Sequence, residues 1–453
     1  MMKRLFGTDG VRGVAGVELT SNLAMEIGKA SAYVLTKNKE NVKVIIGNDG
    51  RESSDMLVAA LKAGLYSLGV SVLDAGLIPT PGISYLVGYY NMDAGIMVTA
   101  SHNSYEYNGI KIFDNNGYKL PDEVEDEIEK CIRENFNYPV NKIGRPLEER
   151  NTTKDYGDHL LECLNKYNPN VNLSSLNIAI DTSNGAASKV SEYIYSKLGC
   201  NYHIINNKPN GTNINDNCGS MHPEILKDYI IKNRLDGGVC YDGDADRSIF
   251  IDELGNIIDG DYIMSIIGLD LKKKEKLNNN TIVGTVMNNL GFINFCKENK
   301  INFITTKVGD RYVLEELKLG SFSLGGEQSG HIILKDYANT GDGELTSLIL
   351  FSILASSSST LSKLSNIMTK YPQVLINVKI SNDKKSDFYM NDKIKKKISE
   401  IETILDSSGR VLVRPSGTEP LIRVMLEGKE LKIINKYAKT LVDLIEEELI
   451  DKE

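Results

Sequence analysis

Short apolar runs that each end in a polar or glycine-rich turn recur along the chain, with helical stretches between them. The runs are residues 42–46, 95–98, 177–180, 238–241 and 281–286. Strands of this length that alternate with helices are typical of α/β domains with parallel or mixed sheets. The pattern therefore predicts one α/β unit that is used about three times.

Polar stretches at 148–155, after 252–256 and around 356–359 suggest where these units end. We place four domains, at residues 1–154, 155–256, 257–370 and 371–453. From Leu431 onward, apolar residues recur at helical spacing with Lys and Glu between them, which predicts a helix that closes the last domain. The apolar positions are Ile434, Ala438, Leu441, Ile445 and Leu449.

Composition excludes several classes of protein. The 453 residues carry a net charge of −9 and show no basic stripe, so we expect no nucleic-acid partner. The six cysteines form no C-x-x-C pair, which favours reduced thiols and a cytoplasmic location. We expect no signal peptide and no membrane partner, because the N-terminus lacks an apolar segment and no apolar run is long enough to span a bilayer.

The turn after residues 95–98 brings a serine beside a histidine, as Ser101 and His102. Ligands of α/β sheets bind where such strands end, so this hydroxyl is a candidate nucleophile. A polar turn is the simpler explanation of the pair taken alone. A hydrolase triad is disfavoured because the G-x-S-x-G nucleophile elbow is absent.

Three carboxylates, Asp242, Asp244 and Asp246, follow the run at 238–241. Oxygen ligands at this spacing suit a hard cation such as Mg²⁺. Without a cation the three charges would repel one another. A calcium EF-hand loop is rejected, because Arg247 stands where its glycine is required and both flanks predict strands rather than helices.

Residues 325–331 form a third polar loop with three glycines, Glu327, Gln328, Ser329 and His331. Acid, amide and hydroxyl groups are the donors and acceptors that bind sugar hydroxyls. A decorated glycine-rich turn without a ligand is the alternative.

A fourth loop begins at Arg414 and is followed by Arg423. Ser416, Gly417 and Thr418 can offer hydroxyls and amides to an anion. The two arginines can add bidentate bonds to phosphate. The alternative is a proline-bounded surface loop.

In this order and at this spacing, the four motifs resemble the α-D-phosphohexomutases over essentially the whole chain. Residues 6–13, 213–220, 308–313 and 340–343, together with Gln328, are most similar to the bacterial members that act on glucosamine phosphates. The resemblance implies four domains around a central cleft: three related α/β units with mixed sheets and a smaller α+β C-terminal domain. It implies sugar phosphates as partners, with a homodimer as the candidate assembly.

The resemblance also implies a reaction and residue roles. Phosphorylated Ser101 would convert glucosamine 6-phosphate to glucosamine 1-phosphate through a 1,6-bisphosphate. One Mg²⁺ per chain would be held by Ser101, Asp242, Asp244 and Asp246. Lys111 would transfer the proton, with its pKa lowered by neighbouring cations such as Arg12 and the metal. The further catalytic residues would be His102, Arg12 and His331; the substrate ligands would be Arg247, Glu327, Ser329, Arg414, Ser416, Gly417, Thr418 and Arg423.

Two positions depart from the family pattern. Ser104 stands where proline is common, which predicts a looser loop, and Gly50 replaces a usual threonine. Two other functions stay open: a Mg²⁺-dependent sugar phosphatase built on the aspartate loop, and a catalytically silent sugar-phosphate sensor. Within the family, phosphoglucomutase and phosphomannomutase are the alternatives.

Overall fold

The chain divides into two compact units. The computed structural model describes residues 4–7, 9–37, 39–134, 136–139, 142–416 and 420–450. The first unit comprises Met1–Met287 and Lys300–Ile367, and the second comprises Asn288–Asn299 and Met368–Glu453.

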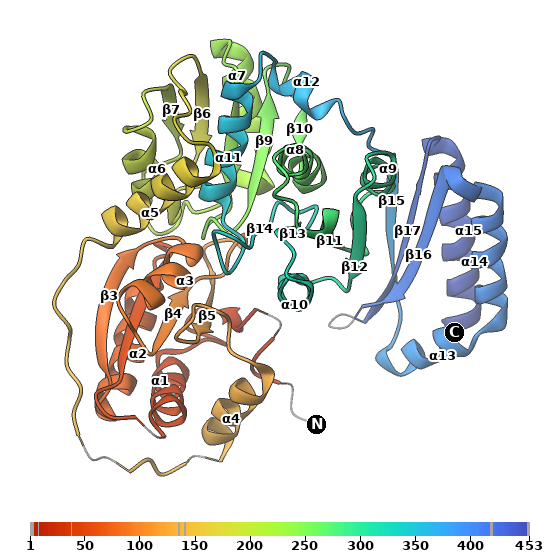
Figure 1. Ribbon diagram of the computed structural model, residues 1–453. Coiled ribbons are helices and arrows are strands. Elements are labelled where there is room, and N and C mark those ends of the chain that lie inside the picture. The colour runs from red at the N-terminus through yellow and green to blue at the C-terminus, as the bar shows by residue number, and fades with distance from the viewer. Residues whose placement is uncertain are drawn as a thin grey trace. The chain divides into compact units, whose positions relative to one another are not determined.

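The first unit begins with a five-stranded mixed sheet in the order β1-β5-β4-β2-β3 (Figure 1). Its strands are β1 (Val11–Val14), β2 (Lys43–Asn48), β3 (Ser71–Leu77), β4 (Ala94–Val98) and β5 (Tyr107–Phe113). Its helices are α1 (Ser21–Thr36), α2 (Ser54–Ser67), α3 (Thr80–Tyr89) and α4 (Asp122–Arg133). Every residue of β4 is buried, which explains why this strand is a continuous apolar run rather than an alternating one.

A second five-stranded sheet has the order β10-β9-β8-β6-β7. Its strands are β6 (Asn177–Asp181), β7 (Asn201–Ile205), β8 (Gly237–Tyr241), β9 (Ser248–Asp252) and β10 (Ile257–Ile258). Its helical elements are α5 (Thr152–Tyr167), α6 (Ala187–Tyr195), η1 (Gly219–Met221) and α7 (Pro223–Asn233).

A third sheet has four strands in the order β12-β11-β13-β14. Its strands are β11 (Thr281–Thr285), β12 (Asn302–Thr306), β13 (Leu324–Gly326) and β14 (Ile332–Leu334). Its helical elements are α8 (Gly260–Lys273), η2 (Asn278–Asn280), α10 (Asp310–Gly320), α11 (Gly343–Ser356) and α12 (Leu361–Ser365). Residues 343–354 of α11 are all buried, as expected of a helix that is apolar on every side and packs between α5 and α8.

The three sheets repeat one arrangement. In each, one strand (β4, β8 or β13) runs parallel to an inner neighbour and antiparallel to the strand that follows it in the chain. The turns after β4, β8 and β13 carry Ser101, the three aspartates and residues 327–331, which belong to the third polar loop and are called the sugar loop below. The expectation of three related α/β units with mixed sheets is confirmed, and the three motif loops occupy equivalent places in them.

The second unit is a smaller α+β domain around an antiparallel sheet in the order β15-β17-β16. Its elements are α9 (Leu290–Glu298), β15 (Gln373–Lys379), η3 (Asn382–Lys384), α13 (Lys385–Met390), α14 (Asp392–Leu405), η4 (Asp406–Ser408), β16 (Gly409–Pro415), β17 (Leu421–Gly428) and α15 (Leu431–Leu449). Figure 1 shows α14 and α15 side by side against these strands. The predicted closing helix is α15, and all five of its expected apolar positions are buried.

All six cysteines are free and buried, in agreement with the expected absence of a disulfide framework. Among the helices described, none combines the length and the apolar character that crossing a membrane requires.

Candidate active site

Ser101 lies in the turn after β4 and is only 1% exposed. Its φ of 53° is left-handed, which is uncommon for a residue other than glycine. Its amide donates to Thr99 Oγ1 at 2.8 Å, and its hydroxyl donates to Asp242 Oδ2 at 2.6 Å. The fold therefore joins the predicted nucleophile to the predicted metal loop, 141 residues further along the chain.

His102 is adjacent to Ser101, and its ring is within reach of both the serine hydroxyl and Arg247. Its Nδ1 lies 3.4 Å from Ser101 Oγ and 3.2 Å from Arg247 Nη1. Burial, followed by the positive charges of Arg247 and Arg12, lowers the pKa of His102 to about 4. The ring is therefore neutral at pH 7 and can accept a hydrogen bond from Arg247, while the serine proton points to Asp242.

Asp242, Asp244 and Asp246 converge, with one carboxylate oxygen of each lying within 4.8 Å of the others. All three are buried, and Oδ1 of Asp244 and of Asp246 have no hydrogen-bond partner among the described residues. Burial and then the charges of Asp246 and Asp244 raise the pKa of Asp242 well above its ordinary value. Unpartnered buried oxygens and mutual repulsion both fit a site for a hard divalent cation.

Lys111, in β5, faces the same carboxylates. Its ammonium lies 2.9 Å from Asp244 Oδ2, 3.4 Å from Asp246 Oδ2 and 3.2 Å from Asp9 Oδ2. Burial opposes the charge, but these carboxylates outweigh burial and raise the pKa of Lys111 well above its ordinary value. The expectation that neighbouring cations lower this pKa is therefore wrong for the charges of the chain itself, because three acidic groups outweigh Arg12.

Two residues that sequence reasoning missed hold this arrangement in place. Thr80, at the start of α3, donates through Oγ1 to Asp244 Oδ2 at 2.6 Å. Asp9 binds Lys111 and also accepts from Arg12 Nη2. Asp9 lies inside the stretch 6–13 that marked the resemblance, so a signal was present for it, whereas nothing local distinguishes Thr80.

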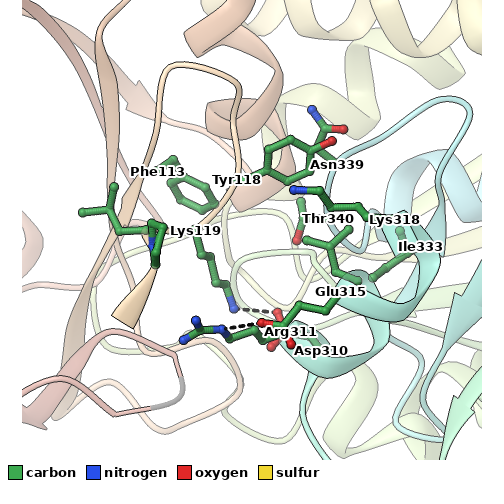
Figure 2. A pocket seen from close by; sticks show the side chains of 13 residues that line it. Phe113, Tyr118, Lys119, Asp310, Arg311, Glu315, Lys318, Ile333, Asn339 and Thr340 are labelled. Carbon is green, nitrogen blue, oxygen red and sulfur yellow. Dashed lines mark hydrogen bonds and ion pairs between the residues drawn. The ribbon is translucent and has the colours of Figure 1, made fainter. Parts of the chain in front are cut away.

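A second missed pair links the first sheet to the third. Lys119 contacts Asp9, and its ammonium lies 2.6 Å from Asp310 Oδ2 (Figure 2). Asp310 Oδ2 lies 3.8 Å from His331 Nε2, and His331 Nδ1 lies 3.6 Å from Asp246 Oδ1. The Gly341 amide donates to His331 Nε2 at 3.1 Å, so a proton on Nδ1 faces Asp246. Burial opposes the charged ring, but Asp246 and Asp310 outweigh burial and raise the pKa of His331. A continuous series of polar contacts thus runs from Lys111 through Lys119 to His331.

Replacing Lys119 by methionine is expected to lower kcat about tenfold. Asp9 and Asp310 would both lose the cation that they share, and their positions relative to Lys111 and His331 would change. Lys318→Met is the matched control. Lys318 lines the same cavity of about 180 Å³, but its ammonium lies 4.0 Å from the Tyr118 ring centroid and not on the acidic groups (Figure 2). Steady-state kinetics that give equal values of kcat for the two variants would contradict this role.

The sugar-loop residues lie beside the metal loop. The Gly330 carbonyl accepts from the Ser248 amide at 3.1 Å, which ties this loop to the start of β9. Glu327 Oε1 accepts from the Gly309 amide at 3.1 Å. Burial disfavours the charge of Arg247, but Asp246, Asp242 and, to a smaller extent, Glu327 outweigh burial and raise the pKa of Arg247. Ser329 is exposed on the same loop.

The predicted phosphate loop lies in the second unit. Arg414 in β16 and Arg423 in β17 are directly opposite partners in the sheet. Burial and then the charge of Arg423 lower the pKa of Arg414, a repulsion that a bound anion would relieve. Lys385, which sequence reasoning missed, donates to the Ser416 carbonyl at 2.7 Å and adds a third cation. The predicted ligands Gly417 and Thr418 lie outside the described residues.

Four family models match consecutive parts of the chain. They describe phosphoglucomutase/phosphomannomutase α/β/α domain I at residues 3–139, domain II at 154–255, domain III at 259–371 and the C-terminal domain at 375–444.

Curated relatives and solved structures agree with these matches. A phosphoglucosamine mutase of Thermoanaerobacter sp. (strain X514) is 51% identical over 99% of this chain and 100% of its own length. Another, from Clostridium botulinum (strain Kyoto / Type A2), is 51% identical over 98% of this chain and 99% of its own. A phosphoglucomutase/phosphomannomutase family protein of Burkholderia thailandensis shares the fold, with a TM-score of 0.78, 23% identity and coverage of 99% and 98%.

An N-acetylphosphoglucosamine mutase of Aspergillus fumigatus, solved with GlcNAc-6P and magnesium, shares the fold with a TM-score of 0.71, 17% identity and coverage of 98% and 95%. The family models cover nearly all of the chain, and the curated relatives are about 50% identical to it over their full length. This chain belongs to the phosphoglucomutase/phosphomannomutase family, the α-D-phosphohexomutases.

Proposed function

We propose that this chain is a phosphoglucosamine mutase, an isomerase that interconverts glucosamine 6-phosphate and glucosamine 1-phosphate and so supplies amino-sugar (UDP-N-acetylglucosamine and cell-wall) synthesis. The observation that carries the proposal is the buried Ser101 hydroxyl, 2.6 Å from a carboxylate of a three-aspartate cluster. The curated relatives at 51% identity, which bear this name, support the choice of sugar.

Asp242, Asp244 and Asp246 would hold one Mg²⁺ per chain together with an oxygen of phosphorylated Ser101. When bound, the cation offsets negative charge on the phosphoryl oxygens, which is the main electrostatic need in phosphoryl transfer. The Aspergillus fumigatus relative was solved with magnesium, in support of this choice of metal.

Ser101 carries the phosphoryl group and gives it to a sugar hydroxyl. In its charged form Lys111 can donate a proton to the sugar oxygen as the phosphoryl group leaves it, and the opposite direction needs the same nitrogen neutral. Arg12, together with Asp9, stands beside Lys111. His331, its Nδ1–H toward Asp246, completes the group of acid–base candidates.

The substrate would be held at two places. Arg247, Glu327 and Ser329 would bind the sugar and its reacting end. The fourth loop would hold the phosphate that is not reacting; its members are Arg414, Ser416, Gly417, Thr418 and Arg423. A 1,6-bisphosphate intermediate must present either end to Ser101, and arginines suit this task because they bind phosphate without reading the shape of the sugar.

A coupled assay that compares glucosamine, glucose and mannose 6-phosphates tests the proposal. The expected result is a kcat/KM for the glucosamine substrate about tenfold or more above the others, with no stoichiometric release of inorganic phosphate. Preference for glucose or mannose would assign the chain to another branch of the family. Steady phosphate release would instead favour the phosphatase built on the aspartate loop.

A further inference from the structure

The side chain of Arg51 is fully buried, and its guanidinium binds the loop that carries Ser101. Arginine has five N–H donors, and here all five have acceptors. Nε donates to Asp49 Oδ2 at 2.8 Å, and the two terminal nitrogens donate to four backbone carbonyls. The four carbonyls are those of Ser101, Asn103, Ser104 and Tyr107.

Asp49 extends this contact to the amide of the nucleophile. Its Oδ2 also accepts from Thr99 Oγ1 at 2.6 Å, and Thr99 Oγ1 in turn accepts from the Ser101 amide at 2.8 Å. Arg51 and Asp49 together therefore fix both the carbonyl and the amide of Ser101.

Asn215 holds the same loop from the side of the second sheet. Its Nδ2 donates to the Ser101 carbonyl at 2.9 Å and to the Asn103 carbonyl at 3.0 Å, two of the four carbonyls that Arg51 binds. Gly243, in the aspartate loop, approaches so closely that a Cβ there would lie 2.6 Å from the Ser101 carbonyl oxygen. The backbone of Ser101 is thus enclosed by both loops.

These contacts involve both positions that depart from the family pattern, Ser104 and Gly50. Ser104 was expected to loosen the loop because it replaces a proline, but Arg51 fixes its carbonyl. Gly50 adopts a φ of +87°, a conformation that a threonine would adopt only with strain, and it precedes Arg51 directly. Hydrogen bonds to one guanidinium thus restrain the loop at the position where a proline is common.

We propose that Arg51 and Asn215 are positioning residues for phosphoryl transfer, an inference that rests on the proposed function. By binding the Ser101 and Asn103 carbonyls together, they keep Ser101 in its left-handed conformation with Oγ directed at Asp242. Phosphoryl transfer depends on in-line placement of the reacting oxygens, so a loop that drifts by a fraction of an ångström lowers the rate without weakening substrate binding.

The test compares Asn215→Ala with Asn217→Ala in the full chain. Asn217 lies in the same loop, is exposed, and donates through Nδ2 to the neighbouring Asp216 rather than to the Ser101 loop. The two asparagines have φ of 57° and 50°, so alanine imposes similar backbone strain at each. The comparison therefore isolates the bonds from Asn215 to the Ser101 loop.

The measured quantities are kcat and KM for the sugar phosphate, and the rate at which a bisphosphorylated hexose phosphorylates Ser101, followed by intact mass. For Asn215→Ala we expect about a tenfold loss in kcat and in the phosphorylation rate, with KM within about twofold of the wild type. For Asn217→Ala both should stay within about twofold. Arg51→Lys, which keeps the charge but offers three donors instead of five, is expected to lose about 100-fold in kcat.

Thermal unfolding of each variant shows whether it is folded, and Asn215→Ala still decides the outcome if Arg51→Lys does not fold. If the bisphosphorylated hexose phosphorylates Ser101 in the wild-type chain and in Asn215→Ala at the same rate, the inference is overturned and the proposed function is not. A wild-type chain in which Ser101 never accepts a phosphoryl group overturns the proposed function and this inference with it. A rise in KM with unchanged kcat also overturns the inference, because it would place Asn215 in substrate binding.

Discussion

Replacing Ser101 by alanine is expected to lower turnover by roughly 10⁴-fold or more, because the variant lacks the oxygen that we propose carries the phosphoryl group between the two ends of the sugar. Intact mass should show the loss of the phosphorylated form. The stability change should be small, about 1 kcal/mol, because the substitution removes the contacts of a single hydroxyl: the hydrogen bond from Oγ to Asp242 and the longer contact with His102.

Ser104→Ala is the matched control for that variant. Ser104 is exposed in the same loop, and Arg51 binds its backbone carbonyl, which alanine retains. Activity within about twofold of wild type is expected for it. Interconversion of the two phosphates by Ser101→Ala at the wild-type rate would rule out the phosphoserine scheme.

Replacing Asp244 by asparagine is expected to remove most of the dependence on Mg²⁺. In the wild-type chain, Mg²⁺ should raise the midpoint of thermal unfolding, because it binds the folded state and neutralises three buried carboxylates. In Asp244→Asn this rise should be largely lost, and kcat should fall by roughly 10³-fold. Calorimetry with and without the metal measures the first effect independently of activity.

Asp228→Asn makes the same change in charge at an exposed position of α7, and it should leave both the metal-dependent rise and the activity intact. Unchanged activity of the wild-type chain after thorough chelation would remove the metal from the proposal. A metal-dependent rise that persists in Asp244→Asn would place the cation elsewhere.

Local pattern was sufficient for much of the fold. An apolar run such as β4 is buried on both faces, and the helical spacing of the residues in α15 buries one stripe, so both leave a periodic signal in a short window. The serine turn and the aspartate loop were found for the same reason, since each directly follows such a run, whereas the sugar and phosphate loops were recognised by their residue types. The serine, aspartate and sugar loops follow β4, β8 and β13. Their equivalent places in three sheets follow from the repeated order of strands, which the sequence only suggested.

Partners across long separations could not be predicted. Lys119 and Asp310 are 191 residues apart, and no feature near Lys119 shows that it bridges two acidic groups. Arg51 likewise carries no local sign of its role, because the role of a buried arginine depends on the carbonyls that it binds. Asp9 and Asp310 lay in stretches that marked the family resemblance, but the resemblance assigned them no role.

Ser101, the three aspartates and the polar turns that carry them were therefore determined by the sequence itself, because strand, turn and ligand type are properties of neighbouring residues. Only the tertiary structure decided how these groups are charged and held. Among the charges of the chain itself, the pKa of Lys111 is raised and not lowered as Arg12 alone predicted, because the pKa depends on every charge within a few ångströms, and Asp9, Asp244 and Asp246 reach Lys111 from distant parts of the chain.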